Sequence, residues 1–93
     1  MLEKNIEQKL AQATRKRGGL CLKFVSPGYA GVPERLTILP GGHVAFIELK
    51  APGQKPRPLQ KHRHQQLRKL GMTVFIVDHP TQIESILDEI QAL

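Results

Sequence analysis

The stretch GVPERLTILPGGHVAFIELK, residues 31–50, constrains the fold of this chain more than any other part of it. Residues 35–39 (RLTIL) and 43–50 (HVAFIELK) have the apolar patterns of β-strands, and the PGG between them supplies a tight turn. The two segments are therefore predicted to pair antiparallel. Because a hairpin brings its open ends together, Glu34 and Glu48 are expected to lie near each other at one end.

Side chains two apart on a strand point to the same face of a sheet, so Glu48 and Lys50 should project together. Both faces of residues 43–50 are apolar over most of their length, with Val44 and Phe46 on one face and the alternate residues on the other. Such a strand is predicted to be central. Glu48 and Lys50 would then lie at the end of a mostly buried strand.

Apolar periodicity and Gly/Pro breaks predict the remaining elements. In chain order they are a helix over residues 3–17, a strand over 20–25, a helix over 58–70, a buried strand over 72–77 and a final helix from Pro80. The helix between the third and fourth strands makes a βαβ crossover, so those strands should be parallel. The prediction is one α/β domain (α+β by some labels) over residues 1–93. It has an α-β-β-β-α-β core, a mixed four-stranded sheet and a C-terminal helix.

The charges are distributed unevenly along the chain. Residues 8–77 carry thirteen Lys and Arg against two carboxylates, Glu34 and Glu48, whereas residues 78–93 carry four acids and no Lys or Arg. With a formal net charge of +6, this asymmetry predicts a surface that faces a polyanion, nucleic acid first and an anionic membrane second. The alternative is a soluble basic protein without such a partner.

Several other features narrow the class of protein. No apolar run is long enough to cross a membrane and the polar N-terminus is unlike a signal segment, so a cytoplasmic protein is expected. The single cysteine, Cys21, excludes an intramolecular disulfide and is predicted to be a buried small side chain. His62 and His64 leave a helix in different directions, which disfavours a zinc site. With one Tyr and three Phe, the sequence predicts no platform for stacking single-stranded bases.

The predicted pair of half-buried carboxylates requires a positive charge nearby, because two carboxylates that lose water repel each other. Mg²⁺ or Mn²⁺ would supply that charge, since hard cations prefer oxygen ligands. A Lys beside such an ion can orient or deprotonate a water, or stabilise charge that develops on a phosphorane. The alternative is a set of ordinary ion pairs, Glu34 with Arg35 and Glu48 with Lys50.

These motifs resemble the VRR-NUC domain family, a branch of the PD-(D/E)XK nuclease superfamily. Pro33-Glu34 and Glu48-Leu49-Lys50 are similar to the superfamily signature, and GVP, the GG turn and Pro58-Leu59-Gln60 are similar to the VRR-NUC branch. The similarity runs from Glu3 to about Asp78. Chains of this size resemble the stand-alone, phage-type members. The resemblance therefore implies a homodimeric, metal-dependent endonuclease that acts on branched DNA such as four-way (Holliday) junctions, inside a bacterial host cell and without a small-molecule cofactor.

The resemblance also implies roles for individual residues. Catalytic roles would fall to Glu34, Glu48, Lys50 and Gln60, and Mg²⁺ or Mn²⁺ would be held by Glu3, Glu34, Glu48 and the backbone carbonyl of Leu49. Glu3 and Glu7 compete for the acid of the first helix. Helical geometry places Glu3 beside the apolar stripe and Glu7 nearer solvent, which favours Glu3. Two solvated acids are the alternative.

Basic side chains around the second helix are expected to contact DNA phosphates, which set affinity without sequence choice. They are Lys55, Arg57, Lys61, Arg63 and Arg68, with Lys69 as a further candidate. Gln60 is predicted to flank an apolar stripe of Leu59, Leu67 and Leu70. Arg63 falls inside that stripe, so it should either extend past it to solvent or point into the site.

One position departs from the family pattern, which usually has Asp after the Pro. Glu34 adds a methylene, which would move a bound metal by up to roughly 1 Å. A non-catalytic DNA-binding module with a degraded site is therefore the rival hypothesis. For the implied homodimer, the apolar side of the C-terminal helix and the first helix are the candidate surfaces.

Overall fold

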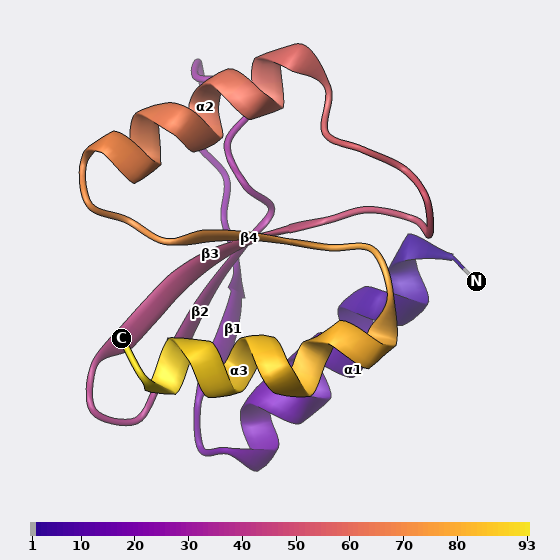
Figure 1. Cartoon of the computed structure of the whole chain (residues 1–93), viewed down its shortest axis with the longest axis vertical. Helices are drawn as coiled ribbons and strands as arrows, with labels where there is room; N and C mark the ends of the chain where they lie inside the picture. The colour runs from indigo at the N-terminus through magenta and orange to yellow at the C-terminus, as the bar shows by residue number, and fades with distance from the viewer. Residues whose placement is uncertain (1) are drawn as a thin grey trace.

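The fold, a computed structural model described over residues 2–93, has a mixed sheet with α2 on one side and α1 and α3 on the other (Figure 1). The elements in chain order are α1 (Glu3–Lys16), β1 (Leu20–Lys23), β2 (Arg35–Leu39), β3 (His43–Leu49), α2 (Pro58–Lys69), β4 (Val74–Val77), the short 3-10 helix η1 (Pro80–Gln82) and α3 (Ile83–Gln91). This element order and the α/β class are those predicted from the sequence.

The sheet has the strand order β1-β2-β3-β4, with β1–β2 and β2–β3 antiparallel and β3–β4 parallel. Strand β3 is thus internal, as its two apolar faces predicted. In the hairpin register Arg35 lies opposite Ile47. Extending that register by one residue places Glu34 opposite Glu48, as the hairpin prediction required.

The main hydrophobic core lies between the sheet and the two helices α1 and α3. Ile6 and Leu10 of α1 and the apolar face of α3 pack against one face of β3, whose Ile47 and Leu49 are fully buried. The apolar sides of α1 and α3 are therefore used inside the fold. The apolar side of α3, one of the candidate dimer surfaces, is thus buried within the monomer, whereas α1 stays a candidate only through its exposed polar side.

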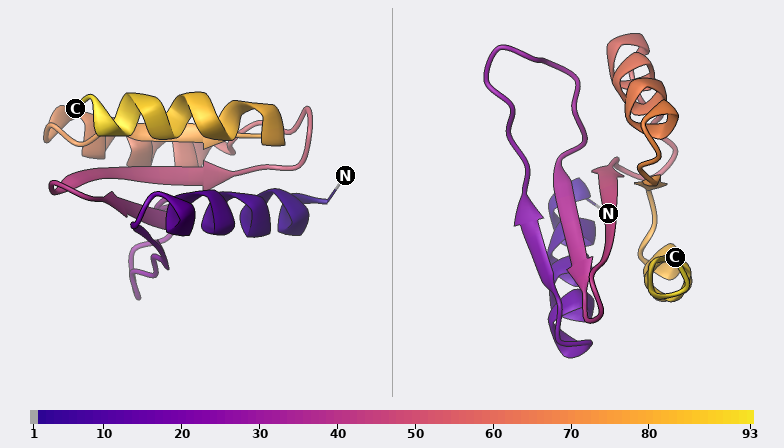
Figure 2. Two further views of the ribbon diagram at one scale, coloured as in Figure 1. Left: turned by 90° about the horizontal axis from the view of Figure 1, so that it is seen from below. Right: turned by 90° about the vertical axis from the view of Figure 1, so that its left-hand side faces the viewer.

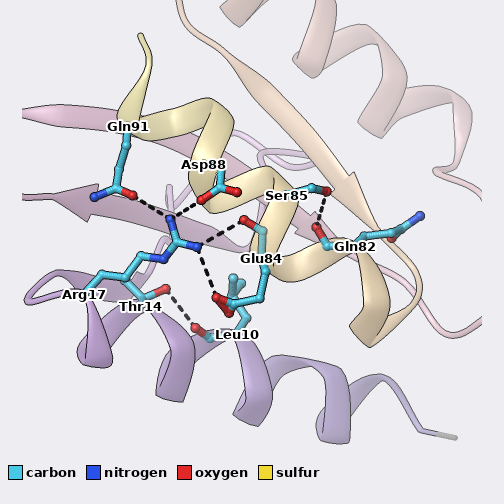
Figure 3. A network of polar contacts seen from close by, with 8 residues as sticks. All are labelled: Leu10, Thr14, Arg17, Gln82, Glu84, Ser85, Asp88 and Gln91. Carbon is cyan, nitrogen blue, oxygen red and sulfur yellow. Dashed lines mark hydrogen bonds and ion pairs between the residues drawn. The ribbon is translucent and has the colours of Figure 1, made fainter.

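Arg17, just after α1, ties the two core helices together at their polar edge (Figure 3). Its guanidinium bonds the Glu84 carboxylate at 3.1 Å and the Asp88 carboxylate at 2.8 Å, and it also bonds the side chain of Gln91. Residues 78–93 contain no Lys or Arg, and two of their four acids, Glu84 and Asp88, thus pair with a cation from the N-terminal part of the chain.

Three details differ from the sequence prediction. Strand β1 ends at Lys23 instead of residue 25, and β4 begins at Val74 instead of residue 72. Strand β4 is an edge strand, and its Ile76 is 37% exposed, so the strand is not buried along its whole length as predicted. A strand extends only as far as the neighbouring strand pairs with it. The composition of one segment does not show where that pairing stops.

The apolar stripe predicted for α2 is wrong. Leu59 and Leu70 are 46% and 81% exposed, and the buried side chains of this helix are Gln60 and His64. The reason is that α2 covers a part of the sheet face that carries the polar end of β3. On the same face, α2 leaves β1 uncovered, with Leu20 and Leu22 exposed to 56% and 43%.

The helices of the described residues, 2–93, include none with the length and apolar composition needed to cross a membrane.

Candidate active site

The site lies where β3 ends, beside the start of β2 and the N-terminus of α2. A cavity of about 380 Å³ opens there, lined mostly by carboxylates, two amides and cations: Glu3, Glu34, Lys50, Ala51, Gln54, Lys55, Arg57 and Gln60. The residues come from four separate parts of the chain. Their meeting point is the open end of the hairpin, which is the place that the two strand-end acids indicated.

Glu48 lies beneath this cavity and is fully buried. Its Oε2 accepts a hydrogen bond from Gln60 Nε2 at 2.9 Å and lies 3.4 Å from the Lys50 ammonium. Its Oε1 is buried and has no hydrogen-bond partner within residues 2–93. Burial raises the pKa of Glu48, and the charge of Lys50 opposes that rise. One oxygen of this carboxylate thus has two partners, whereas the other has no hydrogen-bond partner within residues 2–93.

Gln60 connects the start of α2 to this carboxylate. Pro58 begins the helix at a position where no backbone N–H is needed, and Gln60 Oε1 accepts the backbone N–H of Arg57 at 2.9 Å. The same side chain then donates its amide to Glu48. The hydrogen bond that caps the helix therefore also fixes the orientation of the amide that holds the acid.

Glu34 and Glu3 complete a group of three carboxylates. The pKa of Glu34 is raised to about 7, first by burial and then by the negative charges of Glu3 and Glu48. Glu3 is therefore close enough to act on Glu34, and Glu7 acts on it more weakly. A carboxyl that titrates near neutrality is one whose ionised form lacks a compensating positive charge.

Two ion pairs test the alternative in which Glu34 pairs with Arg35 and Glu48 pairs with Lys50. Arg35 bonds Glu7 at 3.1 Å instead of its neighbour Glu34, so one half of that alternative is wrong. Glu48 does pair with Lys50, as the other half supposed. Glu7 is partly buried in its pair with Arg35, so the alternative in which both acids of the first helix are solvated does not hold for Glu7. Arg35 thereby neutralises Glu7 and leaves Glu34 to the cavity.

The carboxylates fit a hard divalent cation in their chemistry. All three offer oxygen ligands, and the buried Glu48 Oε1 has no partner within residues 2–93. Burial and the neighbouring carboxylates raise the pKa of Glu34, and a cation between them would favour its ionised form. Within residues 2–93, however, no three Asp, Glu, His or Cys side chains already stand close enough together to enclose an ion. The side chain of Leu49 is buried in the core, and its backbone ends β3 directly before Lys50.

Some of the basic residues predicted to contact DNA lie at or near the cavity, and others lie at the C-terminal end of α2. Lys55 and Arg57 line the cavity, and Lys61 is exposed on the next turn of α2. Arg68 donates to the backbone oxygen of Val74 at 2.8 Å and so holds the end of α2 against β4. Lys69 is exposed at the last position of α2. The cations around Arg57 are therefore positioned along a path that leads to the carboxylates.

Arg63 does not point into the site, and that part of its prediction is wrong. Its Nε donates to the backbone oxygen of Ala30 at 2.8 Å, and its guanidinium lies 3.7 Å above the ring of Tyr29. The loop between β1 and β2 approaches α2 so closely that a Cβ at Gly31 would come within 2.9 Å of Leu59 Cγ. Arg63 thus fastens to α2 the loop that leads into Glu34.

His64 is a buried residue near the site that the sequence analysis did not single out as functional. It is 1% exposed, one turn after Gln60 on α2, and its buried Nε2 has no partner within residues 2–93. Burial and the nearby charges of Arg68 and Lys50 lower its pKa. The sequence feature that could have indicated a buried His64 is its spacing from Gln60. These two polar residues are four apart and therefore share one face of the helix.

No protein-family model matches the sequence. A protein named "Putative nuclease p44" from Acyrthosiphon pisum secondary endosymbiont phage 1 is 50% identical over 76 residues, which cover 82% of each chain. A solved structure described as "VRR_NUC domain" superposes with a TM-score of 0.86 at 32% sequence identity, covering 92% of this chain and 94% of that one. Sequence and fold agree over nearly the whole length, and the chain belongs to the VRR-NUC family of nuclease domains.

Proposed function

We propose that this protein is a Mg²⁺- or Mn²⁺-dependent DNA endonuclease that acts as a homodimer on branched DNA such as four-way junctions. The observation that carries the catalytic part is the carboxylate group of Glu3, Glu34 and Glu48 beside Lys50, with one buried carboxylate oxygen left without a partner. Membership of a nuclease family supports the reaction class. A phage relative supports action in the cytoplasm of a bacterial host.

In this proposal Glu3, Glu34, Glu48 and the Leu49 carbonyl hold the metal. When bound, the metal supplies Lewis acidity toward a phosphate oxygen and makes a water more acidic. Gln60 fixes Glu48 through its 2.9 Å hydrogen bond, so the buried acid keeps one orientation. Lys50 is held 3.4 Å from Glu48 and faces the cavity, where its ammonium can position the attacking water or stabilise the pentavalent phosphorane.

The DNA backbone would approach along the cations at the cavity mouth. Lys55 and Arg57 line the cavity and Lys61 continues outward along α2. Phosphate contacts of this kind bind any sequence, because they do not reach base edges. Choice among DNA substrates would then rest on the shape of the DNA and on the spacing of two active sites in a dimer.

The uncovered part of the sheet supports the homodimer. Leu20 and Leu22 of β1 are exposed on the face that α2 leaves open, and Leu36 and Ile38 are their half-buried partners on β2. A contiguous apolar surface on a small domain favours association, since the core of such a domain is limited. A second copy would remove these side chains from water and hold two active sites at a fixed separation.

The catalytic proposal is tested by cleavage of a four-way junction and of a matched linear duplex, with Mg²⁺, Mn²⁺ or chelator present. We expect metal-dependent cuts in the junction and slower cleavage of the duplex. Glu34→Asp should retain activity within about tenfold, because the carboxylate remains and the shift is on the order of 1 Å. Glu34→Gln should lose activity, because it removes the ionised oxygen.

The rival, a DNA-binding module with a degraded site, predicts a different pattern. It requires wild-type protein that binds the junction and does not cut it in either metal. Recovery of cleavage in Glu34→Asp would then identify the extra methylene of Glu34 as the defect. Metal-dependent cleavage by the wild-type protein would eliminate this rival.

The dimer is tested by light scattering coupled to size exclusion. We expect a mass of twice 10.4 kDa for the wild-type protein and a monomer for Leu22→Lys, which places a charge on the open sheet face. Leu93→Lys is the matched control, because Leu93 is also an exposed leucine but lies at the C-terminus. A monomeric wild-type protein at micromolar concentration, or a dimeric Leu22→Lys variant, would count against this surface.

A further inference from the structure

A second cavity, separate from the carboxylates, lies between the β1–β2 loop and α2. Figure 2 (right) shows the loop and the helix extending beyond the strands at the same end of the molecule. The cavity has a volume of about 270 Å³. Its walls include Phe24, Tyr29 and Val32 from the loop side and Leu67 and Leu70 from α2. Two of the four aromatic residues of the chain thus line one small cavity.

The walls of this cavity are held in place before any ligand binds. The Tyr29 hydroxyl donates to Gln66 Oε1 at 3.0 Å, and the Arg63 guanidinium covers the Tyr29 ring at 3.7 Å. The Phe24 ring packs against Phe46 of β3, with ring centroids 5.2 Å apart. Such a preformed aromatic site can bind a flat ring without first paying the cost of ordering its own side chains.

The chemistry of the cavity indicates what could enter it. Its volume is below the roughly 300–1,000 Å³ of pockets that enclose whole drug-sized ligands, so it suits one ring system. The walls are mostly apolar, and Gln66 and Arg63 add an amide and a cation at the edge. None of its lining residues is acidic. An uncharged, flat, polar-edged ring attached to an anionic backbone satisfies each of these features.

The position of the cavity relates it to the site of cleavage. Gln60, which lines the first cavity, and Leu67, which lines the second, are seven residues apart on α2, or roughly 10 Å along the helix axis. That length corresponds to about three base steps of stacked DNA and to fewer steps of an unstacked strand. A strand whose phosphate reached Lys50 could therefore place a nearby base in the second cavity.

We infer that this cavity binds one unstacked nucleobase of the cleaved strand, within about three nucleotides of the scissile phosphate. The inference rests on the proposed function and names the DNA feature that makes the cleavage selective. A base at a branch point has already lost part of its stacking, so moving it into a protein pocket costs less than extruding a base from intact duplex. Contact with Tyr29 and Phe24 then favours branched DNA over linear duplex.

The test is a double-mutant cycle on binding, in the Lys50→Ala background so that the DNA stays intact. Abasic sites are placed one at a time at the three nucleotides on either side of the branch point in each strand, so that the series does not require a known cut position. For one of these positions we expect a loss of junction affinity of about 5- to 100-fold, the range for one base stacked on an aromatic side chain. Leu70→Ser, at the mouth of the cavity, should weaken binding of the intact junction and reduce the effect of that abasic site.

Two further variants keep the result interpretable. Ser26→Phe narrows the same cavity from the loop side and should also reduce the abasic effect, whereas Leu93→Ser changes an exposed leucine outside the cavity and should leave it unchanged. Additive effects of Leu70→Ser and every abasic site would overturn the inference. The inference would also be overturned if Leu70→Ser changed the oligomeric mass of the protein and showed no coupling to any abasic site. A second copy of the chain would then be the occupant of the cavity. Failure of the wild-type protein to cut DNA would refute the proposed function instead, since the binding cycle does not depend on cleavage.

Discussion

Lys50→Ala should reduce the single-turnover rate of junction cleavage by about 10²–10⁴-fold, the range for loss of one group that orients or activates the attacking water. Lys50 is the cation nearest the buried Glu48, at 3.4 Å, and it lines the cavity that Glu34 and Glu3 also line. Junction affinity should change much less than the rate, because Lys55 and Arg57 still line the mouth of the cavity. Rates and affinities are measured separately, by quench and by fluorescence anisotropy.

The control for this result is Lys61→Ala. Lys61 is a lysine on the exposed side of α2, and its loss should weaken binding modestly and leave the single-turnover rate at saturation near the wild-type value. Circular dichroism would establish that Lys50→Ala is folded, since that variant leaves Glu48 buried without its cation. Cleavage by folded Lys50→Ala at the wild-type rate would exclude Lys50 from the catalytic group.

The second large effect concerns stability in the absence of metal. The pKa of Glu34 is about 7 in the folded protein against an ordinary value of 4.5, so between these values the folded state binds more protons than the unfolded state. The free energy of unfolding should therefore fall as pH rises from about 4.5 to about 7 and then level off. The part due to Glu34 amounts to at most about 3 kcal/mol.

Urea denaturation with chelator present, at pH 5 and pH 8, measures this loss. Glu34→Gln should remove most of it, because a neutral amide does not titrate. The difference between the two proteins isolates Glu34 from Glu48, whose raised pKa acts in the same direction, and from His64, whose lowered pKa acts in the opposite direction. A wild-type protein and a Glu34→Gln variant with parallel pH profiles would contradict the electrostatic description of the site.

The same experiment tests whether the carboxylates bind a cation. Mn²⁺ binds the ionised form of a carboxyl, so at pH 8 it should restore the stability that the metal-free protein has lost. Glu48→Gln should weaken this restoration, because it replaces the buried oxygen that has no partner within residues 2–93. If millimolar Mn²⁺ stabilised the wild-type and Glu34→Gln proteins equally, these carboxylates would not be its binding site.

The hairpin and the elements around it could be predicted because they depend on local patterns. The alternation of RLTIL, the PGG turn and the two apolar faces of HVAFIELK determine a pairing register, and that register determines which acid lies opposite which. The place of Gln60 beside the site was an expectation from the family resemblance, and the local sequence is consistent with it. Proline at the first position of a helix fixes where α2 begins, and Gln60 follows two residues later.

The errors arose where a residue's environment depends on a distant segment. The leucines of α2 have helical spacing, yet the helix turns Gln60 and His64 inward because the sheet beneath it presents Glu48 and Lys50. Arg63 was assigned by its angle on that helix, but the β1–β2 loop supplies the Ala30 carbonyl and the Tyr29 ring that hold it. The apolar side of α3, a candidate dimer surface, packs into the core with α1 and β3.

The sequence by itself determined the order of elements, the central position of β3 and the meeting of Glu34 with Glu48, because strand periodicity and turn chemistry act over a few residues. Only the tertiary structure decided which cation neutralises which acid. Arg35 pairs with Glu7, Arg17 pairs with Glu84 and Asp88, and Lys50 lies beside the buried Glu48. The pKa of Glu34 follows from this allocation, since a carboxyl's charge is set by burial and by neighbours that are distant along the chain.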